Sequence, residues 1–186
     1  MSPPSRILIK KSFLVRLIFF LVYFWSLPCP AVEVTKENLF QLATLALKDG
    51  EYEHAVEFFK KAIELDPKFI PAYNSLGIIY ETSGLKDLEE AIRYFKLATE
   101  ISPASQESWN NLGRAYYSKG EFSQAERALL RSLELDPAQP EVEVSLGWIY
   151  LLGQSRGAEA ISHFEKGGAY KDNPMVYYGM GLSYLI

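Results

Sequence analysis

The sequence predicts an all-α fold in which antiparallel helix hairpins follow one another, preceded by an apolar N-terminal helix. The first observation is a recurring proline: Pro67, Pro103 and Pro137 lie 36 and then 34 residues apart. The second is a recurring eight-residue segment with glycine at its fifth position and tyrosine at its last. Its copies are Tyr73–Tyr80, Trp109–Tyr116, Glu143–Tyr150 and Tyr177–Tyr184. Such a period indicates stacked supersecondary units.

Residues 1–31 are typical of a targeting segment. They contain no acidic residue, four basic residues precede the apolar run Leu17–Trp25, and prolines on either side of Cys29 end the run. Small residues at Cys29 and Ala31 fit a signal peptide that is cleaved after Ala31. An uncleaved membrane anchor is the alternative, because the stretch back to Ser12 gives roughly the 20 residues that a spanning helix needs. Both interpretations place the repeats outside the cytoplasm. The protein is then either exported to the periplasm or the extracellular space, or anchored in the membrane with its repeats on the outer side.

Charge and cysteine content exclude several classes of function. The 15 basic and 23 acidic residues from Val32 onward give that part of the chain a net charge of −8. Nucleic acid is therefore an unsuitable partner, since phosphate binding depends on clustered Lys and Arg. Cys29 is the only cysteine. An internal disulfide and a cysteine zinc cluster are thus both excluded.

The helical elements follow from the spacing of their apolar residues. Tyr73, Leu76, Gly77 and Tyr80 recur at i, i+3, i+4 and i+7 and lie on one face of a helix. We expect the array to cover residues 32–186. Its repeats are expected at about 36–69, 70–105, 106–139 and 140–173, with a half repeat at 174–186.

Two sets of glycines have different expected roles. Glycine inside a helix costs about 1 kcal/mol relative to alanine, so its presence there suggests that a neighbouring helix approaches closely. The glycines in this first set are Gly77, Gly113, Gly147 and Gly181. Glycine between paired helices suits a left-handed C-cap. The glycines in this second set are Gly50, Gly84, Gly120 and Gly153.

These residues resemble the tetratricopeptide repeat family, whose signature is an aromatic residue, Leu-Gly and Tyr on a first helix, then Ala, Phe and Ala on a second helix, and an exit Pro. The second repeat carries the full set: Tyr73, Leu76, Gly77, Tyr80, Ala91, Phe95, Ala98 and Pro103. The third repeat departs from it with Leu129 and Ser132, and the fourth with Glu143 and Gly167. The resemblance implies a right-handed superhelical solenoid of antiparallel helix hairpins.

The resemblance also implies an inner groove lined by the first helix of each repeat. The groove positions in the first hairpin are Phe40, Thr44 and Leu47. The partner-binding residues that we expect further along are Asn74, Ile78, Asn110, Arg114, Tyr117, Val144, Trp148 and Leu151. Some members of the family grip an acidic peptide tail with Lys, Asn and Arg. Phe40 and Thr44 stand where such groups are needed, so we do not expect that activity.

The segment Val142–Leu152 is apolar on nearly every side, and such a helix is expected to be covered on every side. Val144, Trp148 and Leu151 are therefore predicted to form an apolar floor in the C-terminal half of the groove. A partner's helix or extended segment could dock there. The alternative is that another part of this chain, such as the linker after Ala31 or the terminal helix, covers the same site.

No catalytic, metal or cofactor site is predicted. His54 and His163 lie in different repeats without the partners of a catalytic set, and we expect both at the surface. No phosphate-binding glycine loop, His-Glu-x-x-His motif or calcium loop is present. The sequence therefore predicts a non-catalytic protein-interaction scaffold or adaptor that binds a protein or peptide partner. The alternatives are a structural subunit of a membrane-attached envelope assembly (secretion, pilus or outer-membrane biogenesis), or the repeat region of a longer protein with a separate catalytic domain.

The half repeat at 174–186 has a first helix without its second. Tyr177, Met180 and Tyr184 are core-type residues that this arrangement leaves uncovered. The helix could itself cap the array, it could pair with a partner or another copy, or the sequence could be cut from a longer protein. We therefore expect self-association through the C-terminal helix.

Overall fold

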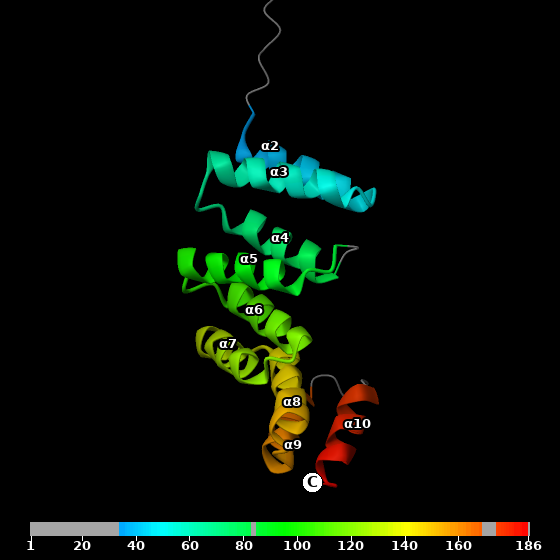
Figure 1. Cartoon of the computed structure of the whole chain (residues 1–186). Helices are drawn as coiled ribbons and strands as arrows, with labels where there is room; N and C mark the ends of the chain where they lie inside the picture. The colour runs from blue at the N-terminus through cyan, green and yellow to red at the C-terminus, as the bar shows by residue number, and fades with distance from the viewer. Residues whose placement is uncertain (1–33, 83–84, 169–173, 186) are drawn as a thin grey trace, which may run out of the picture. The chain divides into compact units, whose positions relative to one another are not determined.

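The computed structural model describes residues 34–82, 85–168 and 174–185. The described helices all belong to one compact unit, Thr35–Ile186. The predicted targeting segment, residues 1–31, lies outside the described residues. Those described residues contain no strand, and the predicted all-helical class is confirmed (Figure 1). Their helices are α2 (Lys36–Lys48), α3 (Tyr52–Leu65), α4 (Ile70–Thr82), α5 (Leu88–Ile101), α6 (Gln106–Lys119), α7 (Phe122–Leu135), α8 (Pro140–Gln154), α9 (Gly157–Lys166) and α10 (Pro174–Ser183).

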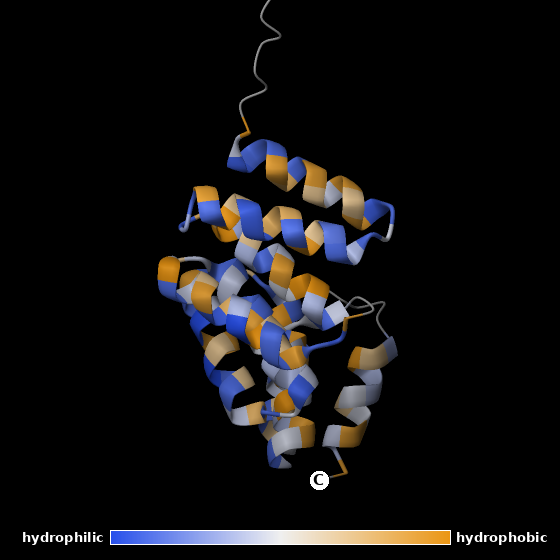
Figure 2. Cartoon of the chain, turned by 45° about the horizontal axis from the view of Figure 1, so that its top comes forward, coloured by the Kyte–Doolittle hydropathy of each residue, from blue (hydrophilic) through white to orange (hydrophobic). Residues whose placement is uncertain are grey.

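The helices pack as consecutive hairpins. The pairs α2 with α3, α4 with α5, α6 with α7, and α8 with α9 have the most extensive contacts, and each second helix also packs on the next first helix. Helix α10 packs on α9 and α8. Figure 2 shows polar and apolar residues alternating along the helices of the first hairpins, whereas α10 carries no strongly hydrophilic residue. Each amphipathic stripe is therefore buried by its neighbours in sequence.

The turns within hairpins depend on left-handed residues, as predicted for Gly50 and Gly120, which have φ of 78° and 82°. Gly84 lies outside the described residues. For Gly153 the prediction is wrong, because α8 continues through it and Ser155 adopts the left-handed conformation with φ of 51°. A Cβ atom on Gly153 would lie 2.5 Å from the Phe122 ring. This glycine therefore permits a close approach of α7.

In α4 and α6 the recurring aromatic residue ties the first helix of the hairpin to the turn before it. The Tyr73 hydroxyl donates to the Pro67 carbonyl at 3.1 Å, and the Trp109 indole Nε1–H donates to the Pro103 carbonyl at 3.0 Å. In both cases the aromatic residue lies six positions after the proline. This hydrogen bond satisfies a carbonyl of the turn and explains why the proline and the aromatic residue recur together.

The core runs through the hairpins as two clusters of buried side chains. One cluster spans α2 to α5 and the other spans α5 to α10, with α5 contributing to both. One second-helix position supplies its largest side chains. Phe59, Phe95, Leu129 and Phe164 occupy this position in successive hairpins, and all are fully buried.

Mid-helix glycines admit these large side chains, as predicted. Cβ atoms built on Gly77, Gly113 and Gly147 would lie 2.4, 2.5 and 2.7 Å from Phe95, Leu129 and Phe164. A real side chain cannot occupy such positions unless the opposing helix moves away. Gly181 of α10 differs, because no described atom of a neighbouring element lies within 4 Å of its Cβ position.

Polar contacts replace the family pattern where the third repeat departs from it. Ser132 is fully buried, and its hydroxyl donates to the Gln106 carbonyl of α6 at 2.9 Å. Between α7 and α8, the Tyr150 hydroxyl donates to Glu126 Oε1 at 2.6 Å. Burial of the phenol, followed by this hydrogen bond, raises the pKa of Tyr150 to about 12. These contacts fix neighbouring helices in register.

The glycine contacts predict opposite effects for one substitution at two equivalent positions. Gly147→Ala should lower the free energy of unfolding by about 1–2 kcal/mol, because overpacking against Phe164 exceeds the gain in helix propensity. Gly181→Ala should leave it unchanged or raise it by up to about 1 kcal/mol. Urea denaturation followed by circular dichroism measures both variants, and equal destabilisation by the two would contradict the packing role.

Candidate functional site

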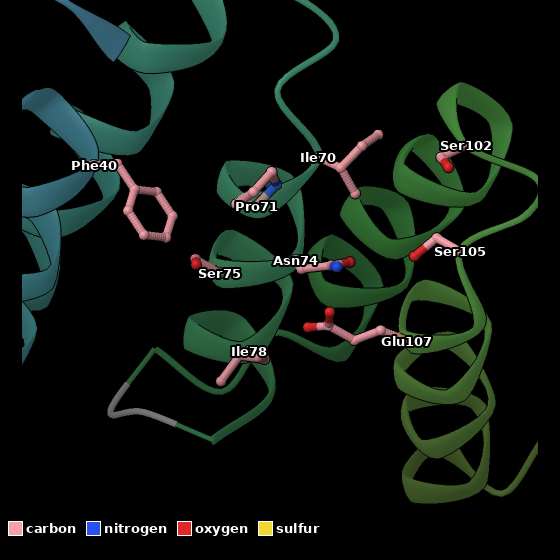
Figure 3. Close-up of a pocket in the computed structure, with 9 residues that line it drawn as sticks. All are labelled: Phe40, Ile70, Pro71, Asn74, Ser75, Ile78, Ser102, Ser105 and Glu107. Atoms are coloured by element: carbon pink, nitrogen blue, oxygen red, sulfur yellow. The ribbon is translucent and has the colours of Figure 1, made fainter. Parts of the chain in front are cut away.

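A hollow of about 360 Å³ lies between α2, α4 and the start of α6 (Figure 3). Most of its wall comes from the first helices of three successive hairpins. The lining residues are Phe40, Ile70, Pro71, Asn74, Ser75, Ile78, Ser102, Ser105 and Glu107. The two predicted groove residues of α4, Asn74 and Ile78, therefore belong to this pocket, together with Phe40 of α2. We call it the α4–α6 pocket.

Local sequence sets the walls of the pocket. Pro71 occupies the first turn of α4, where its missing N–H costs no hydrogen bond. Ser105 is the N-cap of α6, and its Oγ accepts from the Ser108 backbone N–H at 3.3 Å. Glu107 follows in the first turn of α6, where the helix dipole favours a carboxylate. Ile78 is 39% exposed and forms an open apolar part of the wall.

Asn74 is the unusual residue of this pocket. Its side chain extends from α4 toward α6 in Figure 3, and the residue is only 5% exposed. Its Oδ1 atom has no hydrogen-bond partner among the described residues. On the facing helix, the buried Nδ2 of Asn111 likewise lacks a partner within the described part of the chain. A buried polar atom without a partner costs about 1–3 kcal/mol, so such groups in a groove indicate a place for a ligand or water.

Arg114 is already engaged within the chain. Its Nη2 lies 2.9 Å from Oε2 of Glu81 on α4, and the Glu81 side chain is 7% exposed. The Ser118 hydroxyl donates to the other Glu81 oxygen at 3.4 Å. The predicted partner-binding role of Arg114 thus competes with an ion pair that joins α4 to α6.

The other two predicted residues of α6 are partly covered. Asn110 is half-buried. The Tyr117 ring packs edge-on to Phe122, with 5.9 Å between ring centroids, and burial raises the pKa of its hydroxyl. Neither residue lines the α4–α6 pocket.

The predicted apolar floor in the C-terminal half is mostly covered by the chain itself. Trp148 packs edge-on to Phe164 at 5.4 Å between centroids and lies 6.5 Å from the Tyr178 ring of α10. A Cβ atom on Gly179 of α10 would lie 3.1 Å from Trp148. The terminal helix therefore covers this site, which was the alternative to partner docking. Because Trp148→Ala would remove intramolecular packing, it is not a clean test of binding.

Leu151 and Val144 are also used internally. Leu151 is 4% exposed and belongs to the core, so its assignment to an accessible floor is wrong. The burial arises because α8 is contacted from several sides, by α7, α9 and α10. A Cβ atom on Gly167 would lie 2.6 Å from Val144, which explains why the fourth repeat has glycine there. Val144 accordingly packs on the end of α9.

Several residues of the pocket were not predicted. Apart from Ser75 in the middle of α4, they come from helix starts and from the turn between hairpins. They are Ile70, Pro71, Ser75, Ser102, Ser105 and Glu107. The sequence pattern indicated only groove residues that flank the apolar stripe in the middle of each first helix. The first turn of a helix contributes equally when the next hairpin lies beside it, and a Ser N-cap followed by an acidic residue could have indicated Glu107.

The described residues contain no group of three or more His, Cys, Asp or Glu side chains that could hold a metal ion. His54 is exposed, as expected. His163 is not a surface residue, since its side chain is 14% exposed, stacks on Tyr150 and lies 2.6 Å from Oε2 of Glu143. It joins α9 to α8.

Across the described residues, no helix is long and apolar enough to cross a membrane.

Comparison with known families identifies the class of protein. Residues 83–144 match the family described as tetratricopeptide repeat, and residues 47–84 match a second family described as TPR repeat. The two matches together cover more than half of the chain. This protein therefore belongs to the tetratricopeptide repeat family. No curated protein sequence matches it significantly.

Solved structures place the fold among other arrays of this type. MamA superposes with a TM-score of 0.72 at 25% identity over 80% of both chains. Pseudomonas aeruginosa PilF has a TM-score of 0.69 at 26% identity, covering 80% of this chain and 68% of its own. YrrB, described as a TPR protein with an unusual peptide-binding site, has a TM-score of 0.69 at 23% identity, covering 80% and 75%. The last likeness concerns the fold alone.

Proposed function

We propose that this protein is a non-catalytic scaffold that binds a segment of a partner protein along α2, α4 and α6. The observation that carries the proposal is the α4–α6 pocket, which combines an exposed apolar wall at Ile78 with the unpartnered amide oxygen of Asn74. A peptide offers both apolar side chains and hydrogen-bonding groups, so one extended or helical segment can satisfy the two. The solved structure of YrrB supports the idea that an array of this fold can hold a peptide.

Site-specific photo-cross-linking tests where the partner binds. A photoreactive residue at Ile78, which lines the pocket, should give a discrete cross-linked product in native cells. The matched position is Lys61 on α3, whose side chain is 49% exposed and does not line the pocket. Mass spectrometry of the product identifies the partner segment. Equal yields of the same product from both positions would contradict a groove-specific site.

We further propose that the protein is exported or membrane-tethered, with its repeats on the outer side. The support is the sequence of residues 1–31, with basic residues before an apolar run and small residues ahead of Val32. Cell fractionation with N-terminal mass spectrometry should find either a protein that begins at Val32 outside the cytoplasm, or an intact chain in the membrane fraction. An intact chain in the cytoplasmic fraction would contradict both forms of the proposal.

The terminal helix favours a second activity, self-association. Gly181 occupies the position that large side chains cover in earlier hairpins, and no neighbouring described atom lies within 4 Å of its Cβ position. Tyr177 on α10 and Tyr184, which directly follows this helix, are 58% and 71% exposed. A second copy of α10 could cover this surface, because exposed apolar faces of this kind commonly mark interfaces.

Light scattering across a wide range of concentrations tests this second activity. The wild-type chain should shift from monomer to dimer, and Tyr177→Lys should suppress the shift. Leu42→Lys on α2 is the matched control, since Leu42 is also an exposed apolar residue but lies in the first hairpin. A wild-type chain that stays monomeric, or a dimer that Tyr177→Lys leaves intact, would exclude this interface.

A further inference from the structure

The lining of the α4–α6 pocket contains hydrogen-bond acceptors and a negative charge but no positive charge. Its polar members are Asn74, Ser75, Ser102, Ser105 and Glu107, and none of the nine lining residues is Lys, Arg or His. A pocket of this composition is unsuited to a carboxylate or phosphate, because anion sites are built from Arg, Lys and free N–H groups. Its charge complements a cation.

Glu107 supplies the charge. It is exposed, it extends from α6 toward α4 in Figure 3, and it makes no ion pair among the described residues. Arg114 and Lys119 are the only basic residues on α4, α6 and α8, and both are paired with acidic side chains. The central first helices therefore offer an unneutralised carboxylate and no unpaired basic side chain.

Asn74 supplies the acceptor. Its Oδ1 atom is buried and unpartnered, and its side chain extends into the space between the two helices. An N–H donor from a bound ligand would satisfy this atom, and satisfying it removes a cost that the unbound protein carries. A cationic nitrogen is a suitable donor because all its hydrogen-bonding capacity is donation.

The apolar wall accommodates a flexible stem. Ile70, Ile78 and Phe40 line the same pocket, and Ile78 is 39% exposed. Lysine and arginine place their methylene stems along apolar surface while the charged group reaches polar partners. The N-terminus of α6 does not favour an anion instead, because the Ser105 side chain caps it and Glu107 would repel an anion there.

We infer that the α4–α6 pocket binds a lysine or arginine side chain of the partner segment, with the cation at Glu107, an N–H donated to Asn74 Oδ1, and the stem against Ile70 and Ile78. This inference rests on the proposed groove-binding function and specifies the chemistry of its partner. A basic segment also suits the net charge of −8 from Val32 onward.

Two probes of the same shape test the assignment on the isotopically labelled full chain by NMR. N-acetyl-lysine methylamide carries the ammonium, and N-acetyl-norleucine methylamide has the same stem without it. The lysine probe should bind about tenfold more tightly, the combined effect of an exposed ion pair and one further hydrogen bond. Its shifts should concentrate on the Asn74 side-chain amide and the first turn of α6.

Charge-removing variants identify the carboxylate. Glu107→Gln should weaken lysine-probe binding about threefold and leave norleucine-probe binding unchanged. Glu141→Gln is the matched control, because Glu141 is the second residue of α8 as Glu107 is of α6, is exposed, and does not line the pocket. The control should bind both probes as the wild type does.

Asn74→Leu separates binding from folding. Removal of an unpartnered buried acceptor should leave the midpoint of urea unfolding unchanged or raise it, while lysine-probe affinity falls at least threefold. A lower midpoint would show that Asn74 serves the fold and would overturn its assignment.

Equal affinity for the two probes, or equal losses in Glu107→Gln and Glu141→Gln, would overturn the cation site. If cross-linking at Ile78 still captures a partner, the groove function stands and only the basic side chain is wrong. If cross-linking shows no groove-specific product, the scaffold function itself fails.

Discussion

The structure depends on one steric constraint, the packing of a large second-helix side chain directly against a glycine of the first helix. At Gly77 and Gly147 there is no room for even a methyl group between the backbone and the phenylalanine rings of α5 and α9. This contact sets how closely the two helices of a hairpin approach. The contact recurs at Gly113 against Leu129, so the hairpins that begin with α4, α6 and α8 are packed in the same way, and the first two of these helices line most of the α4–α6 pocket.

Helices α8 and α10, both at the C-terminal end of the array, differ in how they are covered. At α8, the terminal helix α10 packs against Trp148 and supplies cover that a partner could otherwise provide. In α10, no described atom of a neighbouring element lies within 4 Å of the Cβ position of Gly181. We therefore propose that the recognition surface lies toward α4 and α6, where the ion pair between Glu81 and Arg114 joins the two helices that flank the pocket.

Much of the fold could be predicted because it depends on local spacing. Prolines, mid-helix glycines and aromatic residues recur along the sequence, and each has a direct physical contact, such as the hydrogen bond from Trp109 to Pro103. The site was less predictable, because it depends on contacts between neighbouring hairpins. The periodicity of α8 could not show that α10 covers Trp148 or that Leu151 is core. Likewise, the periodicity of α6 could not show that Arg114 forms an ion pair with Glu81, a residue 33 positions earlier.

The face formed by α2, α4 and α6 is the surface that we propose holds a guest polypeptide. Hydrogen exchange of the full chain, with and without the partner segment identified by cross-linking, measures this most directly. The partner should slow exchange in Ile70–Thr82 and in the first turns of Gln106–Lys119, and leave α3 and α7 unchanged. Protection confined to α3, α5 and α7 would show that the partner binds the opposite helices and would contradict the account.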